Sequence, residues 1–318
     1  MHKLARRSTA CALLALAAAL AAPLRAAEPP ATRVGPAPDA TAAAAATPVS
    51  SSSIAAQRRL ERQIRLALDS AQPMAARRTA LAAVEQAAQD SNGEAQFVVG
   101  SLYMWGPEHP AALLPRDLGQ AQTHLSNAAT RGWLQAMAAM AEVSLIEKQP
   151  EAAQIWALVD YYFSGADHYA AKGYLADLIH RSERSLTAGQ RQQALAAANA
   201  FIARYQAGIR TAHAKDRQSL PGCDLHYLHP RRRRHLAGIG PDSDAPRSGD
   251  AMFLVGVDRA GKVERVIAIN SFPSWRVFRI TRRMAHDTRF NPAPACSTAL
   301  RWGMMPFDYG SGEYEFNR

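Results

Sequence analysis

Four adjacent arginines among three histidines form the densest group of charged and metal-binding residue types in this sequence. They are Arg231, Arg232, Arg233 and Arg234, with His226, His229 and His235 around them. Such a run favours an anionic surface, lipid phosphate or a cell-wall polymer, although runs of like charge usually stay hydrated. Histidines three and six residues apart in a proline-containing loop match no zinc pattern. We expect no metal here, and at most a weak contact of the arginines with an anionic partner.

The sequence contains none of the common catalytic motifs, such as a Gly-x-Ser-x-Gly elbow, a His-Glu-x-x-His pair or a glycine-rich phosphate loop after a strand. Its acidic residues are scattered singly. Asp258 belongs to a turn, where the side chain bonds its own backbone, and Asp167 precedes an apolar helical stretch as a helix cap. We therefore expect a protein that is not an enzyme, with no catalytic residue and no cofactor.

The first 26 residues have the pattern of a cleavable secretory signal. Basic residues precede an apolar, Ala-rich run from Ala10 to Leu24, and small residues follow it. The run is too short to span a bilayer comfortably. Cleavage near Ala26 would discard Cys11 and release a soluble protein into a bacterial periplasm. We expect a periplasmic protein, with an inner-membrane anchor as the alternative if the segment is retained.

The positive charge is concentrated towards the C-terminus of the chain. The whole sequence has a formal net charge of +10, and residues 201–318 alone carry +8. A basic surface would suit nucleic acid in the cytosol, but export removes that partner. We expect no nucleic acid, and anionic or protein partners in the cell envelope.

Two cysteines survive processing, Cys223 and Cys296. In an oxidising compartment an even pair favours a disulfide, and closing a loop of about 73 residues would stabilise the fold by about 4 kcal/mol in the chain-entropy model. Two buried thiols that never meet are the alternative. We predict the disulfide, because a small sheet domain gains most from a cross-link.

The composition divides the mature chain into four segments. Residues 27–53 are an Ala/Pro/Ser-rich disordered linker, 54–210 a helical repeat domain, 211–250 an Arg/His/Pro-rich connection with at most one short strand near 225–228, and 251–318 a C-terminal domain. Prolines and glycines mark most joints of the helical domain. The helices expected there are 54–70, 74–90, 94–105, 117–131, 133–147, 151–164, 168–181 and 187–209.

A single unit of the helical domain resembles a Sel-one-like repeat, the helix-pair relative of the tetratricopeptide module. The resemblance rests on the spacing of Ala95, Gly100, Tyr103, Gly106, Asp117, Ala121, Ala128, Ala129 and Gly132. Small residues let two helices approach closely, while Tyr103 and its neighbour Trp105 fill the gap. A second, degenerate unit begins at Ala136. Because repeats must stack to bury their faces, we expect a short α-solenoid of two to four units.

The stretch from Met252 to Ala293 predicts a β-hairpin, a helix beginning near Ser274 and a final strand. Its order of signals resembles the C-terminal domain of TonB-like proteins, over about a fifth of the chain. The matching residues are Val257, Asp258, Gly261, Val263, Ser271, Pro273, Arg289, Phe290 and Pro292. The resemblance implies a small antiparallel sheet with one helix that has no catalytic pocket and acts by pairing with other proteins. The fold class expected is therefore mainly α with an α+β C-terminal domain.

The last expected strand, from Thr298 to Phe307, contains Pro306, which favours an edge position because proline cannot donate to a strand ladder. In the family it resembles, a partner's extended segment adds to such an edge. The candidate pairing residues are Leu300, Arg301, Trp302 and Met304.

We expect an exported, non-enzymatic protein-interaction protein with two independent cores, one helical and one built on the sheet. Its partners would be proteins of the cell envelope, with an outer-membrane protein as one candidate. The first alternative is a divergent TonB-type energy transducer serving an outer-membrane transporter, if the N-terminal segment stays as an anchor. The second is a cell-envelope hydrolase that uses its repeats for docking.

Overall fold

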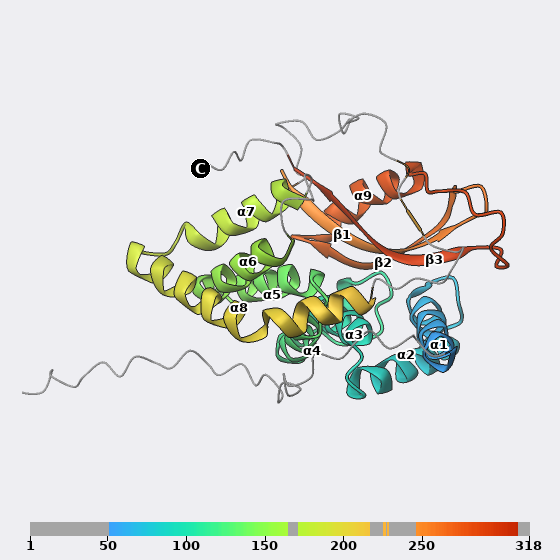
Figure 1. The fold of residues 1–318 in the computed structure, drawn as a ribbon, viewed down its shortest axis with the longest axis horizontal. Coiled ribbons are helices and arrows are strands. Elements are labelled where there is room, and N and C mark those ends of the chain that lie inside the picture. The colour runs from blue at the N-terminus through green and yellow to red at the C-terminus, as the bar shows by residue number, and fades with distance from the viewer. Residues whose placement is uncertain (1–50, 165–170, 217–224, 227, 229–245, 311–318) are drawn as a thin grey trace, which may run out of the picture. The chain divides into compact units, whose positions relative to one another are not determined.

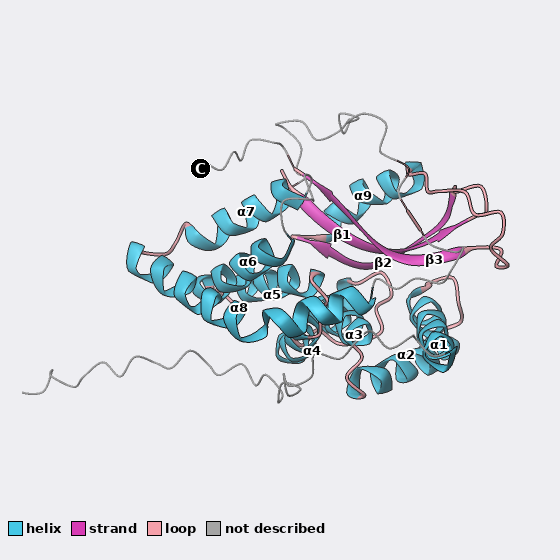
Figure 2. Cartoon of the chain, in the orientation of Figure 1, coloured by secondary structure: helices cyan, strands magenta, loops and turns pink. Residues whose placement is uncertain are grey.

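The computed structural model describes residues 51–164, 171–216, 225, 226, 228 and 246–310 (Figure 1). These residues are mainly helical, and they form a small three-stranded antiparallel sheet towards the C-terminus (Figure 2). The expectation of a mainly α chain with an antiparallel sheet and one helix at its end is confirmed at this level. Among the residues described, every helix is too short or too polar to cross a bilayer.

In the described residues eight helices precede the sheet, and their bounds follow the expected ranges closely, except that the last one continues to Asp216 where the prediction ended at 209. They are α1 (Ser51–Leu68), α2 (Met74–Gln89), α3 (Gly93–Trp105), α4 (Leu118–Thr130), α5 (Gln135–Ile146), α6 (Pro150–Ser164), α7 (Ala171–Glu183) and α8 (Ala188–Asp216), with a short 3₁₀ turn, η1 (Gly106–Glu108), after α3. Two predicted boundaries coincide with side-chain caps. Asn92 accepts a hydrogen bond from the Ala95 N–H, and Asp117 accepts one from the Gln120 N–H.

Consecutive helices pack on one another from α1 to α6, and the long α8 returns to pack on α6 and to contact α4. Gly132 shows why the chain needs glycine where it leaves α4. Its φ is +87°, and a Cβ there would lie 2.5 Å from the backbone nitrogen of His213 on α8. The joint after α4 is therefore fixed both by its own backbone and by a helix about 80 residues away in sequence.

The sheet has the order β2-β1-β3, with all neighbours antiparallel. Its strands are β1 (Gly249–Val257), β2 (Val263–Phe272) and β3 (Arg301–Tyr309), and α9 (Trp275–Asp287) lies between β2 and β3 in the chain. The predicted hairpin, helix and last strand are all present. The strand β2 continues through residues 270–272. These residues are buried, and β2 contacts α1 and α3 as well as α9, so tertiary packing extends the strand.

The expectation of two independent cores is wrong. One face of the sheet packs with α9, through residues such as Phe253 and Phe290. The other face, with Met252, Leu254 and Ile269, belongs to the same buried cluster as the helical residues. The sheet thus lies between α9 and the helical layer (Figure 1). Strand side chains alternate between faces, and a second apolar face has to be covered. The helices α1, α3 and α7 contact the strands from this side.

Candidate partner-binding surfaces

The residues that carry the Sel-one-like spacing do come together, in the pair formed by α3 and α4. The small residues of the motif are buried: Ala95, Gly100, Ala121, Ala128 and Ala129. A Cβ on Gly100 would lie 2.8 Å from Leu125 Cγ, so the helices approach as closely as the pattern suggested. Tyr103 stacks on His124 with ring centroids 5.9 Å apart.

The remaining motif residues shape the turn between the two helices. The Tyr103 carbonyl accepts a hydrogen bond from the backbone N–H of Asp117, the cap of α4. Gly106 has a φ of +53°, and a Cβ there would lie 2.4 Å from the Arg116 nitrogen. The motif is therefore structural. It builds a helix pair and offers no reactive group of its own.

A cavity of about 360 Å³ lies against this pair, where α2, α3 and α4 meet. Its walls are mostly polar side chains with no carboxylate among them: Ala88, Gln89, Ser91, Gln96, His124, Asn127 and Arg131. The Arg131 guanidinium donates to the Asn127 carbonyl at 3.2 Å. Burial lowers the pKa of both Arg131 and His124. Amide, hydroxyl and guanidinium groups are suited to the backbone and carboxylate groups of a peptide. Sequence reasoning missed this cavity because its walls come from three helices.

The TonB-like motif residues also meet, at the turn that joins β1 and β2. The Asp258 carboxylate accepts from the Lys262 N–H at 2.8 Å, as its turn role predicted. Gly261 has a φ of +87°, and its carbonyl accepts from the Phe290 N–H at 2.8 Å. A Cβ on Gly261 would lie only 2.0 Å from the Phe290 carbonyl oxygen. The turn and the segment after α9 are thus one bonded unit.

The other motif residues have supporting positions around the same sheet. Val257, Val263 and Phe290 are buried against α9, whereas Arg289 and Pro292 are exposed. The Ser271 hydroxyl donates to the Ser274 carbonyl at 2.9 Å, and the peptide bond before Pro273 is cis. The motif has an architectural role throughout.

The candidate pairing strand β3 forms one edge of the described sheet, and Pro306 lies opposite Met252 of β1. Arg301, however, is 3% exposed and not a surface residue. Its guanidinium donates to the Asn291 carbonyl, to Asn291 Oδ1 at 3.3 Å and to the Asp258 carbonyl at 3.4 Å. Burial lowers its pKa. The Arg301 side chain is therefore not available to contact a partner strand.

Trp302 and Met304 are half-buried and face the helical layer, and Leu300 lies just before the strand. The Arg65 guanidinium of α1 lies 4.6 Å from the Trp302 ring centroid. Only the backbone of these residues is left to serve as a pairing edge.

The short strand predicted near 225–228 falls partly outside the described residues, which here are 225, 226 and 228, so it stays a prediction. These residues run beside the segment after α9. The His226 carbonyl accepts from the Asn291 N–H at 2.9 Å, and the Leu228 N–H donates to the Arg289 carbonyl at 3.0 Å. The described part of this segment therefore packs near the sheet, as expected.

A buried polar cluster that the sequence did not predict joins the sheet to the helices. Asn270 is fully buried. Its Oδ1 accepts from Trp105 Nε1 at 2.6 Å, and its Nδ2 donates to the Ser101 hydroxyl at 2.7 Å. His109 Nδ1 accepts from the Ala111 N–H, which places the proton on Nε2, facing the Ile269 carbonyl at 3.0 Å. Burial lowers the pKa of His109 to about 4. This end of β2 is consequently bonded to the helical layer.

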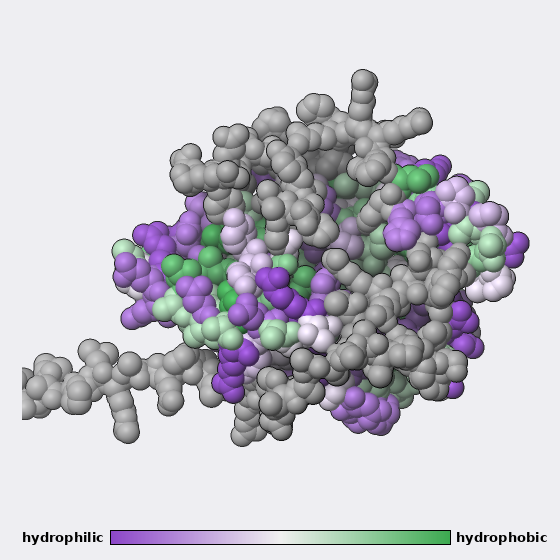
Figure 3. Space-filling model, viewed as in Figure 1, coloured by the Kyte–Doolittle hydropathy of each residue, from purple (hydrophilic) through white to green (hydrophobic). Residues whose placement is uncertain are grey.

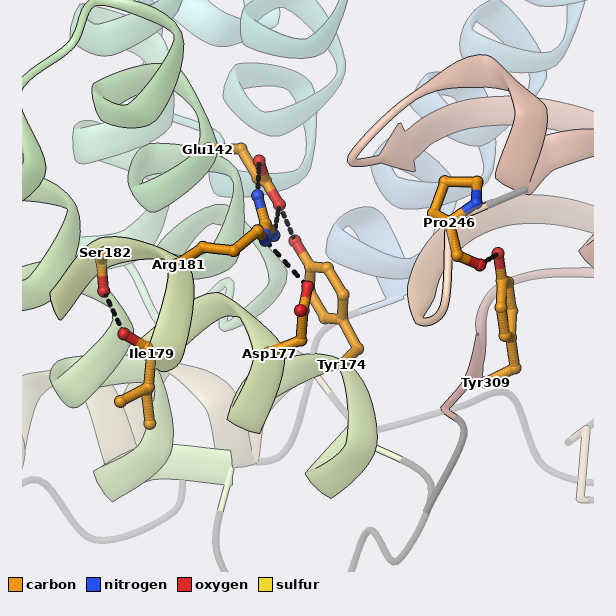
Figure 4. A network of polar contacts seen from close by, with 8 residues as sticks. All are labelled: Glu142, Tyr174, Asp177, Ile179, Arg181, Ser182, Pro246 and Tyr309. Atoms are coloured by element: carbon orange, nitrogen blue, oxygen red, sulfur yellow. Dashed lines mark hydrogen bonds and ion pairs between the residues drawn. The ribbon is translucent and has the colours of Figure 1, made fainter. Parts of the chain in front are cut away.

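The helix α7 is joined to α5 by a second polar network (Figure 4). The Tyr174 hydroxyl and the Arg181 guanidinium both donate to the Glu142 carboxylate, the former at 2.7 Å, and Arg181 also pairs with Asp177 at 2.8 Å. At the end of the sheet that contacts α7, Asp250 of β1 lies opposite Asp308 of β3. Burial raises the pKa of Asp308 to about 6 and that of Asp160 to about 7.

On the face drawn in Figure 3, hydrophilic and hydrophobic residues are interspersed over α6 and α8. Tyr162 of α6 is 39% exposed. Its hydroxyl donates to Gln206 Oε1 at 2.8 Å, and the Arg210 guanidinium lies 5.5 Å from its ring centroid. Tyrosine and arginine are enriched in protein interfaces, so this is a second surface with interface character.

Several sequence predictions fall partly or wholly outside the described residues. Cys296 is disulfide-bonded, but its predicted partner Cys223 is outside them, so that pairing stays a prediction. The arginines 231–234, His229, His235 and Asp167 are also outside them. Within the described ranges, no three His, Cys, Asp or Glu residues are placed to hold a metal ion.

Comparison with known protein families, with curated proteins and with solved structures gave no match to this chain. The Sel-one-like and TonB-like resemblances stay predictions.

Proposed function

We propose that this chain is an exported, non-enzymatic protein of the bacterial cell envelope that binds other proteins. In this proposal the helices form a short Sel-one-like solenoid that binds a peptide segment, and the C-terminal sheet is a TonB-like strand-pairing unit. The cavity between α2, α3 and α4 carries the proposal, because polar side chains from three helices line a hollow there.

The chemistry of the cavity walls supports a peptide ligand. A peptide backbone presents alternating donors and acceptors, and Gln89, Ser91 and Asn127 supply both kinds of group. The Arg131 guanidinium donates to a backbone carbonyl, and no acid in the cavity walls neutralises its charge. It can therefore pair with a carboxylate of the ligand. A cavity of about 360 Å³ is at the small end of ligand sites, which suits one or two residues of a longer segment.

The proposal also includes strand pairing, and the outer strands differ in their suitability for it. The C-terminal part of β2 is bonded to His109, and the strand contacts α1 and α3. A partner strand added there would have to displace the helical layer. We assign the pairing role to β3, where the TonB-like resemblance also places it.

Site-specific photo-crosslinking in cells tests the peptide site. A photoreactive amino acid at Gln89, an exposed cavity residue, should give a discrete adduct with an envelope protein. The same amino acid at Gln193, exposed on α8, is the matched control. Arg131→Gln should weaken the Gln89 adduct. Equal adducts from both positions, or an adduct that Arg131→Gln leaves unchanged, would argue against the cavity as the site.

A further inference from the structure

The outer face of α9 is an arginine face made of Arg276, Arg279, Arg282 and Arg283, all of which are exposed. The opposite side of the helix packs on the sheet through Val277, Thr281 and Ala285. Residues three, four and seven apart project from the same side of a helix, so four guanidinium groups share one surface.

Three of these arginines have no ion-pair partner among the described residues: Arg279, Arg282 and Arg283. The nearest notable contact is that of Arg282, whose guanidinium lies 6.0 Å from the Phe278 ring centroid. By contrast, Arg265 pairs with Asp69 at 2.7 Å, and Arg181 pairs with Asp177 at 2.8 Å. Unpaired charges this close repel one another. Their clustering points to an anionic ligand outside the chain.

The surroundings of the arginine face decide which anionic ligand fits it. A protein interface is centred on buried apolar or aromatic anchors. None of the large hydrophobic residues exposed in the described ranges lies on α9. The helix also presents a convex surface, which can lie against a plane of charges. Guanidinium groups bind phosphate bidentately, and a layer of lipid headgroups offers phosphates without requiring an apolar anchor.

We propose that the arginine face of α9 binds a membrane surface that contains anionic phospholipid. This binding is electrostatic and peripheral, and it does not depend on the peptide cavity or on strand pairing. An arginine near such a surface contributes about a factor of five to binding, so neutralising three of them weakens it roughly 100-fold.

Vesicle sedimentation with the full chain after signal cleavage tests this inference. The protein should pellet with phosphatidylcholine vesicles that contain phosphatidylglycerol, and not with phosphatidylcholine alone. The variant Arg279→Gln/Arg282→Gln/Arg283→Gln should bind about 100-fold more weakly. The matched control is Arg58→Gln/Arg59→Gln/Arg62→Gln, which removes the same charge from exposed positions on α1 and should bind as the wild type does.

Three results would overturn the proposal: equal loss of binding in the α1 control, equal binding to neutral vesicles, or binding to duplex DNA without binding to anionic vesicles. Two further measurements guard against a misfolded variant. Replacing the same three α9 residues with lysine keeps the charge and should keep most of the binding. For the wild type, raising NaCl from about 0.05 M to about 0.5 M should release the protein, because screening shortens the range of the attraction. Salt-resistant binding would contradict an electrostatic surface.

Discussion

Replacing Asn270 with alanine should destabilise the whole described fold, including helices far from it in sequence. The side chain is fully buried and makes three hydrogen bonds. It accepts from Trp105 Nε1 at 2.6 Å and from the Ser271 N–H at 2.8 Å, and it donates to the Ser101 hydroxyl at 2.7 Å.

The expected loss of stability follows from these contacts. Each hydrogen bond contributes about 1 kcal/mol net, and a buried donor left without an acceptor costs about 1–3 kcal/mol more. Alanine leaves the indole N–H of Trp105, a residue that is 5% exposed, in that position. The sum is a loss of about 4–6 kcal/mol, a large share of the roughly 5–15 kcal/mol that is usual for a folded domain.

Urea unfolding followed separately by tryptophan fluorescence and by far-ultraviolet circular dichroism measures the effect. Both signals should move together to a lower midpoint in Asn270→Ala, because the sheet and the helices share one buried cluster. Asn199→Ala, at an exposed position on α8, is the control and should change the free energy of unfolding by less than about 0.5 kcal/mol. A helical signal that stays at the wild-type midpoint while the sheet unfolds early would refute the shared core.

Gly106, Asp160 and the disulfide at Cys296 each allow a further test of stability. Gly106→Ala should lower the free energy of unfolding by more than about 1 kcal/mol, the cost of a strained residue with positive φ. The control Gly189→Ala, at a position with open space around it, should be neutral or slightly stabilising. Equal effects of the two substitutions in denaturant titrations would contradict this. The raised pKa of Asp160 means that its contribution to stability is full below about pH 4 and is lost as the pH rises through about 7. The free energy of unfolding of the wild type, relative to that of Asp160→Asn, should therefore fall over this pH range and then level off. A rise over the same range would contradict the raised pKa. Reduction of the disulfide at Cys296 should destabilise the chain by about 4 kcal/mol, and thiol labelling under denaturing conditions should increase only after reductant is added.

The helices could be predicted from the sequence because their signals are local. Asn92 and Asp117 cap the helices that follow them, and Gly132 ends the helix pair, all within a few residues of the observed boundaries. The hairpin was predicted for the same reason, since Asp258 and Gly261 define its turn through contacts inside the turn itself.

The contacts between distant segments could not be predicted. Trp105 and Asn270 are 165 residues apart, and nothing in the residues around either one specifies the other. Arg301 has the charge of a surface residue, yet it is buried among carbonyl groups from other segments of the chain. The cavity has the same character, because its walls come from three helices and no single stretch of sequence contains its pattern.

The shared core also decides which experiments can locate the partner sites. Removing the C-terminal sheet would strip the cover from buried helical residues such as Ile64 and Leu102, which belong to one cluster with Leu254 and Ile269 of the sheet. A truncated chain would expose this apolar surface and bind other proteins nonspecifically, so a loss or gain of partners would not identify a site. Surface changes in the full chain avoid this problem. Gln89 and Arg131 probe the cavity and Arg283 probes the arginine face, and all three lie outside the core that the helices and the sheet share.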